Sequence, residues 1–225
     1  MVKIIEPSVK VITKLDGNQI LKHIETCGRT CYQSYQNETE DVSSAEKMIA
    51  MLIKSGHESV LEHYSITIKM ITDVGCYKDL TRHRAGTAFS IESTRFCNYS
   101  KDKFGNEISF IKPININENT PEYDIWYKCI NDIEESYIKM AELGCKPDQL
   151  RMILPHSTSA EVSMTANLRS WRHIFKMRCA KQTHPSVRQM MLITLNEFHK
   201  NIPVIFNDLY DQFKEDINCF NIDGL

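Results

Sequence analysis

Two short arginine-bearing segments carry the side chains best suited to binding an anionic ligand. The first is Arg82-His83-Arg84, and the second is Ser93-Thr94-Arg95. An arginine guanidinium binds phosphate through two parallel hydrogen bonds, and each hydroxyl can donate one more. The first segment alone also has a structural interpretation, because cations near the end of a predicted helix interact favourably with its dipole. Together with the basic residues of 151–188, these segments favour an anionic ligand.

The basic residues are concentrated late in a chain whose formal net charge is only -2. Residues 118–148 hold eight acids and three lysines, whereas residues 151–188 hold seven bases, five of them arginines, and the single acid Glu161. A basic stripe on a helix is often just a solvated face. It also permits a rival function, which is the binding of nucleic acid through residues 151–188.

The segment from His57 to His63 superficially suggests a zinc protease. That motif needs two histidines four residues apart on a helix with a glutamate between them. Here the histidines are six residues apart, which on a helix would separate them by about 120°. We therefore expect no metal site. We interpret the segment after Gly56 as a loop that presents His57 and Ser59 to a ligand, and a purely structural histidine is the alternative.

Other catalytic motifs are absent from the sequence. There is no G-x-S-x-G elbow, no Walker loop and no G-x-G-x-x-G, so arginines, serines and helix ends would have to hold any phosphate. Cys179 follows Arg178 and could form a thiolate, but no histidine lies beside it. We expect reduced, structural thiols in a cytoplasmic protein for all eight cysteines, which are Cys27, Cys31, Cys76, Cys97, Cys129, Cys145, Cys179 and Cys219.

Four motifs in order resemble those of the flavin-dependent thymidylate synthases, and the resemblance spans most of the chain. They are G-H-x-[ST] at 56–59, R-H-R at 82–84 with S-x-R and an aromatic residue at 93–96, R-x-x-L-P at 151–155, and N-x-R at 167–169 followed by Arg178. The chain departs from the family pattern in four places. The loop before the S-x-R motif has one extra residue. Ile91 occupies the position where the family often has a glutamate, and the nearest glutamate, Glu92, lies one residue later. Asp79 replaces a glutamine, and His173 replaces an asparagine.

The resemblance implies a cytoplasmic enzyme that converts dUMP to dTMP. Methylenetetrahydrofolate would supply the carbon, and NADPH would supply the reducing equivalents through FAD, with no protein nucleophile. The resemblance also implies a homotetramer whose active sites are shared between subunits. Neither nucleic acid nor a membrane is an expected partner.

Roles for individual residues follow from the same resemblance. The residues implied to bind FAD are Ser59, Arg82, His83, Arg84, Glu92, Asn167, Leu168, Arg169 and His173. Those implied to bind substrate are His57, Asp79, Arg82, Glu92, Ser93, Thr94, Arg95, Arg151 and Arg178. His57 resembles an imidazole that lies near the flavin and the folate. Arg178 resembles the catalytic residue that stabilises uracil ionised at N3, and arginine suits this role because it stays protonated while stabilising negative charge.

The elements that position these residues can be predicted from apolar spacing and turn signals. Residues 2–15 are typical of one or two strands interrupted by Pro7, with a turn at Asp16-Gly17. A helix follows over 18–31, and Ser43 with Glu46 predicts a capping box for a helix that ends at Gly56.

A half-buried strand over 65–71 and a helix capped by Asp73 come next. Residues 97–113 suggest a hairpin or two extended segments around Gly105-Asn106. Pro121 begins a helix that ends at Gly144 and carries an apolar face of Ile125, Cys129, Ile133 and Met140. Shorter helices are predicted over 147–155, 167–178, 186–200 and 203–214.

Composition fits one globular domain. The chain has 225 residues, of which 42% are hydrophobic and 25% charged, and this excludes a mostly disordered or collagen-like protein. The sequence has no run of about 18 apolar residues, and its first residues lack the long apolar stretch typical of a signal peptide, so we expect neither a membrane span nor secretion. We predict a single α+β domain over 1–225, with a mixed β-sheet flanked by long helices, similar to the thymidylate synthase complementing proteins.

Overall fold

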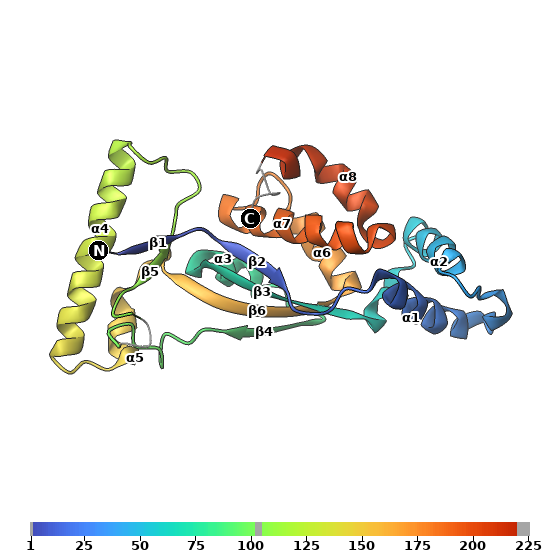
Figure 1. Ribbon diagram of the computed structural model, residues 1–225, viewed down its shortest axis with the longest axis horizontal. Helices are drawn as coiled ribbons and strands as arrows, with labels where there is room; N and C mark the ends of the chain where they lie inside the picture. Colours follow the sequence, from blue (N-terminus) through green and yellow to red (C-terminus); the bar gives the residue numbers. More distant parts are fainter. Residues whose placement is uncertain (1, 102–104, 220–225) are drawn as a thin grey trace.

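The centre of the computed structural model, which describes residues 2–101 and 105–219, is a four-stranded antiparallel sheet (Figure 1). The strands lie in the order β2, β3, β6, β4. Their bounds are Ser8–Val11 for β2, Ser65–Asp73 for β3, Ser159–Asn167 for β6 and Thr87–Ile91 for β4. The long central pair, β3 and β6, aligns Ser65 with Asn167 at one end and Asp73 with Ser159 at the other.

The two faces of this sheet differ in polarity because successive side chains point to opposite sides of a strand. On one face Ile66, Ile68 and Met164 are fully buried. On the other face the Thr67 and Thr165 hydroxyls lie 2.8 Å apart in a hydrogen bond, and a 2.6 Å ion pair joins Lys69 to Glu161. The apolar face is therefore the one that packs against helices.

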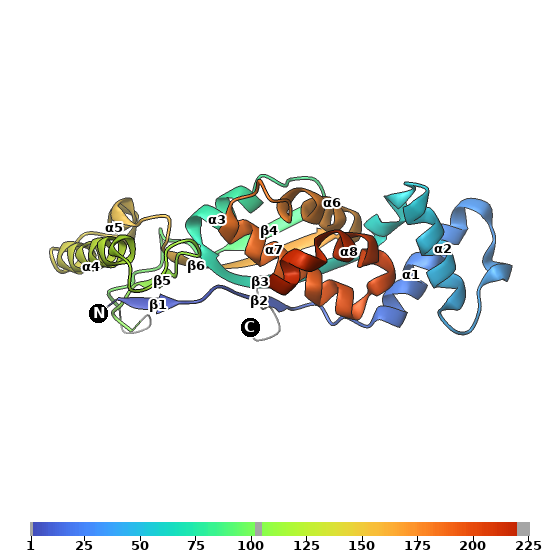
Figure 2. The ribbon, with the colours of Figure 1, turned by 90° about the horizontal axis from the view of Figure 1, so that it is seen from above.

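Helices cover the apolar face in two layers, as Figures 1 and 2 show. Those next to the sheet are α3 (Val74–Leu80), α6 (Leu168–Arg178) and α7 (Pro185–Asn201), and α8 (Pro203–Cys219) packs on α7. Helix α7 is buried along most of its length and packs against α8 as well as the sheet. Trp171 of α6 packs edge-on against Phe198 of α7, and its indole N–H donates to the Ile66 carbonyl over 3.0 Å.

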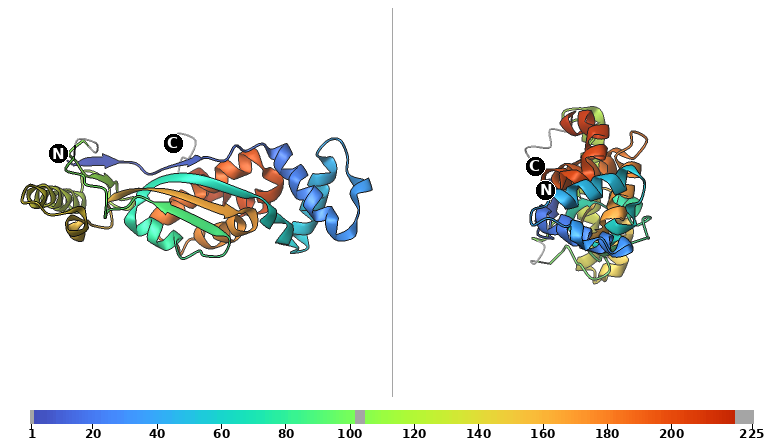
Figure 3. Two further views of the ribbon diagram at one scale, coloured as in Figure 1. Left: turned by 90° about the horizontal axis from the view of Figure 1, so that it is seen from below. Right: turned by 90° about the vertical axis from the view of Figure 1, so that its right-hand side faces the viewer.

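Helices α1 (Gly17–Arg29) and α2 (Ser43–Lys54) lie together at one end of the molecule (Figure 3). The 3-10 helices η1 (Thr30–Tyr32) and η2 (Tyr35–Asn37) lie between them, and η3 (Glu58–His63) leads from α2 to β3. Gly56 ends α2 with a φ of +74°, while His57 N–H donates to the Leu52 carbonyl over 2.8 Å. This is the glycine-dependent helix end that the sequence predicted.

A second hydrophobic cluster lies at the opposite end (Figure 1). There β1 (Lys3–Ile5) pairs in parallel with β5 (Ser109–Ile111) beside α4 (Pro121–Glu142), α5 (Pro147–Leu150) and the 3-10 helix η5 (Arg151–Ile153). Phe110 and Tyr137 form its centre. An isolated bridge between Phe110 and Thr158 connects this cluster to the start of β6.

The mixed α/β class, with long helices flanking the sheets, is confirmed. Several local predictions are wrong. Asp16 does not form a turn but caps α1 by accepting from Gln19 N–H over 3.1 Å. The capping box at Ser43 does not form, because the helix already begins at Ser43 and its hydroxyl donates to Asp41 over 2.8 Å.

Two further differences concern strand pairing and the orientation of α4. Of the two alternatives for residues 97–113, a hairpin or two extended segments, the hairpin is not seen among the described residues, because β5 pairs in parallel with β1; residues 102–104 lie outside the described residues. On α4 the buried side chains include Ile130 and Tyr137, whereas Ile125 is 71% exposed. The buried face is therefore rotated from the predicted one. Within the described ranges, no helix is both long enough and apolar enough to cross a bilayer.

We predict that Asp73→Ala destabilises the protein by about 1 kcal/mol, the usual cost of losing an N-cap. The Asp73 carboxylate is 9% exposed and accepts from Cys76 N–H over 2.7 Å at the start of α3. Urea unfolding monitored by circular dichroism measures the change. Asp211→Ala, at an exposed position on α8, is the control and should change stability by less than about 0.5 kcal/mol. Equal effects of the two substitutions would contradict the capping role.

Candidate active site

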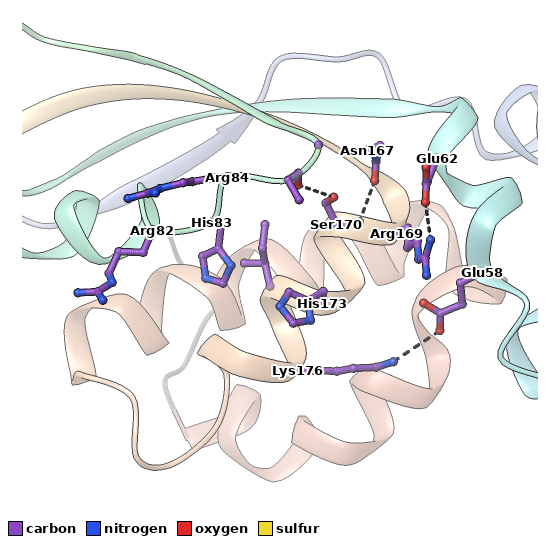
Figure 4. A pocket seen from close by; sticks show the side chains of 13 residues that line it. Glu58, Glu62, Arg82, His83, Arg84, Asn167, Arg169, Ser170, His173 and Lys176 are labelled. Carbon is purple, nitrogen blue, oxygen red and sulfur yellow. Dashed lines mark hydrogen bonds and ion pairs between the residues drawn. The ribbon is translucent and has the colours of Figure 1, made fainter.

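A cavity of about 630 Å³ lies where three segments distant in sequence meet (Figure 4). These segments are the turn after α3, the exposed face of α6 and the 3-10 helix η3. The register of the sheet brings them together, because β3 begins, and β6 ends, at the paired residues Ser65 and Asn167. The cavity is lined by Glu58, Glu62, Arg82, His83, Arg84, Ala85, Gly86, Asn167, Arg169, Ser170, His173, Ile174 and Lys176.

The R-H-R motif forms the turn that leaves α3. His83 N–H donates to the Leu80 carbonyl over 3.0 Å, which closes the turn just past the helix end. Arg82 and Arg84 are exposed on either side, while the His83 ring is half-buried between them. The turn therefore presents two guanidinium groups to the cavity and retains the imidazole inside.

A glycine is required where this turn meets α6. Gly86 has a φ of +64°, and a Cβ there would lie 2.6 Å from both Asn167 Nδ2 and Ser170 Oγ. Asn167 caps α6 by accepting from Ser170 N–H over 2.8 Å, and the Ser170 hydroxyl donates to the Ala85 carbonyl over 2.9 Å. The R-H-R turn is thus fastened directly to the start of α6.

Arg178 contacts the same turn from the other end of α6. Its Nε–H donates to His83 Nε2 over 2.8 Å, and its Nη2 donates to the Asp79 carbonyl over 2.9 Å. Because Nε2 accepts a hydrogen bond, the His83 ring is neutral and carries its proton on Nδ1. Burial, with smaller contributions from Arg178 and from His173, whose ring centroid lies 6.0 Å away, lowers the pKa of His83 to about 4.

Two carboxylates compensate the cations on the opposite wall (Figure 4). Glu62 pairs with Arg169, and Glu58 lies 3.5 Å from Lys176 Nζ. Arg82 and Arg84 face the same cavity. The N-terminal end of α6, an 11-residue helix, opens beside these cations, and such ends favour negative charge. The site can therefore bind an anionic group such as a phosphate.

A second group of predicted residues lies at the other end of the central sheet. Glu92 to Arg95 follow β4, whose five residues span about 16 Å at roughly 3.3 Å per residue. The Glu92 carboxylate accepts from the Tyr99 hydroxyl over 2.8 Å and from Glu161 N–H over 3.2 Å. Arg95 is exposed, with its guanidinium carbon 5.4 Å from the Phe96 ring centroid. Ser93 is exposed and Thr94 half-buried in the same turn, and Arg151 is exposed on η5.

Four other predicted residues lie beside the cavity without lining it. His57 and Ser59 are exposed and flank Glu58 at the start of η3. Leu168 is fully buried in the hydrophobic core, so only its backbone could contact a cofactor. Asp79 is half-buried and contributes its carbonyl to Arg178, whereas the prediction assigned it to substrate.

The motif comparison missed several lining residues. Lys176 could have been found, because Arg169, His173 and Lys176 are spaced four and three residues apart and so share one face of a helix. Glu58 and Glu62 could not have been found from sequence spacing. Their partners, Arg172 and Arg169 respectively, lie more than 100 residues away along the chain.

The bases of residues 151–188 do not form one solvated stripe. Arg172 is 1% exposed, and Arg188 is half-buried in a 2.5 Å ion pair with Asp216. This distribution does not favour the nucleic-acid interpretation. Cys179 is fully buried, and burial raises the pKa of its thiol well above the ordinary value, which disfavours a reactive thiolate. No group of three or more metal-ligating side chains occurs in the described part of the chain.

Fold and pocket together define an α+β protein with an arginine-lined cavity between the turn after α3, α6 and η3. The family model described as thymidylate synthase complementing protein matches residues 10–204. The chain is 27% identical over 219 residues to the flavin-dependent thymidylate synthase of Mycobacteroides abscessus, covering 90% of this chain and 84% of that protein. It is 25% identical over 219 residues, with the same coverage, to the flavin-dependent thymidylate synthase of Corynebacterium efficiens.

The crystal structure of the UMP/dUMP methylase PolB from Streptomyces cacaoi, bound with 5-Br UMP, has the same fold. The TM-score is 0.73 at 17% identity, and the match covers 94% of this chain and 97% of that one. The chain belongs to the thymidylate synthase complementing protein family, which confirms the resemblance drawn from the four motifs.

We predict that His83 makes stability pH-dependent on the acid side. Its pKa is about 4 in the folded protein and 6.5 ordinarily, so between these values the unfolded chain binds a proton that the folded chain does not. The stability that the neutral ring contributes is present above about pH 6.5 and lost as the pH falls toward about 4. His83→Gln should therefore lose less stability than the natural protein between pH 7.5 and pH 4.5.

Thermal unfolding at several pH values measures this difference. His184→Gln, which removes an exposed histidine, is the control and should retain the pH dependence of the natural protein. If His83→Gln also retains it, the ring does not resist protonation in the folded state.

Proposed function

We propose that this protein is a flavin-dependent thymidylate synthase that methylates dUMP to dTMP. In this proposal methylenetetrahydrofolate donates the carbon and NADPH the reducing equivalents, through FAD. The observation that carries the proposal is the contact of Arg178 with His83 and Asp79 at the wall of an arginine-lined cavity, in a chain of this family. A cytoplasmic location, with neither nucleic acid nor membrane as partner, is part of the proposal.

The cavity residues fit a flavin dinucleotide. Its diphosphate needs cations and N–H donors, and Arg82, Arg84 and Arg169 line the cavity together with Asn167 and Ser170 at the N-terminal end of α6. Because Gly86 has no Cβ, the R-H-R turn can lie close to Asn167 and Ser170. We propose that these residues, with His83 and His173, hold FAD. When bound, the flavin supplies hydride chemistry, and the protein supplies binding, orientation and electrostatics.

We propose that Arg178 stabilises the anionic uracil ring of dUMP. Its two contacts with the R-H-R turn fix the guanidinium at one end of α6. They use two of its five N–H donors, so other donors can bind a ligand. Because arginine does not release its proton, it stabilises negative charge that develops on the substrate. This role requires no protein nucleophile, in agreement with the burial of Cys179.

We further propose that two subunits build each site within a homotetramer. Asp79, Arg82 and Arg178 lie at one end of the sheet, whereas the segment Ser93–Arg95 and Arg151 lie toward the other. One dUMP molecule bound by all of these groups would need the second set from a neighbouring copy. A shared site also gives a role to the exposed Arg95, which projects beside Phe96, itself 76% exposed.

The experiment that tests the function combines flavin absorbance with tritium release. Purified protein should be yellow, and it should release tritium from dUMP labelled at C5 when methylenetetrahydrofolate and NADPH are present. Flavin binding without tritium release would indicate a relative that has lost this activity. A colourless protein that binds DNA in a strongly salt-dependent manner would support the nucleic-acid alternative.

We predict different consequences for substitutions of Arg178, which contacts the lining residue His83, and of Arg84, which itself lines the cavity. Arg178→Ala should lower turnover by about 10²–10³-fold, the usual cost of removing one charge-stabilising donor, and should leave FAD bound. Arg84→Ala should instead weaken flavin retention. Lys181→Ala, at an exposed position just beyond α6, is the matched control and should alter neither property. Steady-state kinetics and the flavin content of each variant measure the difference, and full turnover in Arg178→Ala would refute the assigned role.

A further inference from the structure

Arg172 is a buried cation that none of the roles above uses. It lies on α6 and is 1% exposed. Its Nη1 donates to Asp208 Oδ1 over 2.8 Å and to the Ile205 carbonyl, and its Nη2 donates to Asp208 Oδ2 over 2.7 Å. Its Nε–H donates in another direction, to Glu58 Oε1 over 3.1 Å. One guanidinium therefore joins α6 both to α8 and to η3.

The two carboxylates have different surroundings. The Asp208 side chain, on α8, is 51% exposed. The Glu58 side chain is 17% exposed, lines the cavity and also faces Lys176. The bidentate pair with Asp208 already fastens α6 to α8, so the Glu58 contact has a separate consequence. It fixes the start of η3 relative to α6.

The position of η3 determines where its neighbours lie. His57 and Ser59 adjoin Glu58 on either side, and both are exposed at the edge of the cavity. The main-chain hydrogen bond from His57 to Leu52 ties His57 to α2, not to α6. Two other ion pairs join η3 to α6. One links Glu58 to Lys176, whose side chain is 47% exposed, and the other links Glu62 to Arg169, whose side chains are 47% and 52% exposed. Exposed pairs of this kind are weak, so the buried contact is the firmer tether.

We propose that Arg172 is a positioning residue, which holds Glu58 from inside the protein and so sets the His57–Ser59 segment at the flavin cavity. The inference rests on the proposed function for its consequence in catalysis. Its structural part stands on the contacts alone. A displacement of about 1 Å at a reacting centre can cost 10²-fold in rate, so a tether behind the site can matter as much as a residue within it.

Three single variants separate positioning from charge and from general stability. Glu58→Ala removes the tether, whereas Glu58→Gln removes the same charge but keeps an oxygen that accepts from Arg172 Nε–H. Asp208→Asn weakens the other side of the guanidinium without altering η3. Hydrogen exchange of the amides of residues 57–63 reports the tether directly. Titration of flavin-free protein with FAD, followed by flavin fluorescence, reports the cavity.

In Glu58→Ala we expect exchange of these amides to be at least tenfold faster and the Kd for FAD to rise at least fivefold. In Glu58→Gln we expect the exchange rate, and in Asp208→Asn both quantities, to stay within twofold of the natural protein. Arg172→Met should reproduce the faster exchange, and adding Glu58→Ala to it should cause no further increase. If Arg172→Met does not fold, the three single variants still decide the question.

Two results would overturn the inference. One is unchanged exchange at 57–63 in Glu58→Ala, and the other is an equal effect of Glu58→Ala and Glu58→Gln, which would assign the effect to charge. Failure of the natural protein to bind FAD would instead refute the proposed function. The exchange data would still decide whether Arg172 holds η3.

Discussion

The antiparallel pairing of β3 with β6 is the interaction on which the candidate site depends. Nine residue pairs align Ser65 with Asn167, so η3 and α6, which adjoin these residues, meet at one end of the sheet. The pairing of β4 with β6 then aligns Thr87 with Ala166 and brings the R-H-R turn to the same place. A slip of one residue would move Ile66 and its neighbours to the polar face, so the hydrophobic core enforces the register that builds the site.

Two ion pairs at the cavity differ in their exposure to water. The pair of Arg169 with Glu62 is about half exposed, so water screens it, and an anionic ligand can compete with Glu62 for the guanidinium. The pair of Arg172 with Glu58 is largely withdrawn from water, where the loss of one partner strands a charge and is costly. Glu58 is therefore part of the fixed wall, whereas Arg169 can exchange Glu62 for a phosphate. A site built this way balances its positive charge without a ligand and remains open to one.

The sequence was sufficient for the features that depend on local physics. The cap at Asp73 and the glycine end at Gly56 follow from backbone hydrogen bonding, and the strand from Ser65 follows from strict alternation. Strands β4 and β6 were missed because serine, threonine and alanine supply much of both, which leaves weak hydrophobic contrast. Motif resemblance found Arg82–Arg84 and Asn167, which converge on the cavity. It could not find Arg172 and Glu58, because their pairing arises from tertiary contact across 114 residues.

The hydrogen bond between Arg178 and His83 gives the histidine of the R-H-R turn a different role from the two arginines beside it. A protonated His83 could not accept from Arg178 Nε–H, so the contact exists only while the imidazole is neutral. The arginines on either side remain charged at every physiological pH, and the positive potential of the cavity therefore does not depend on histidine titration. The imidazole instead orients Arg178, as a neutral acceptor at a fixed distance behind the guanidinium. The histidine between the two arginines thus serves the geometry of a third arginine, Arg178, which approaches from the far end of α6.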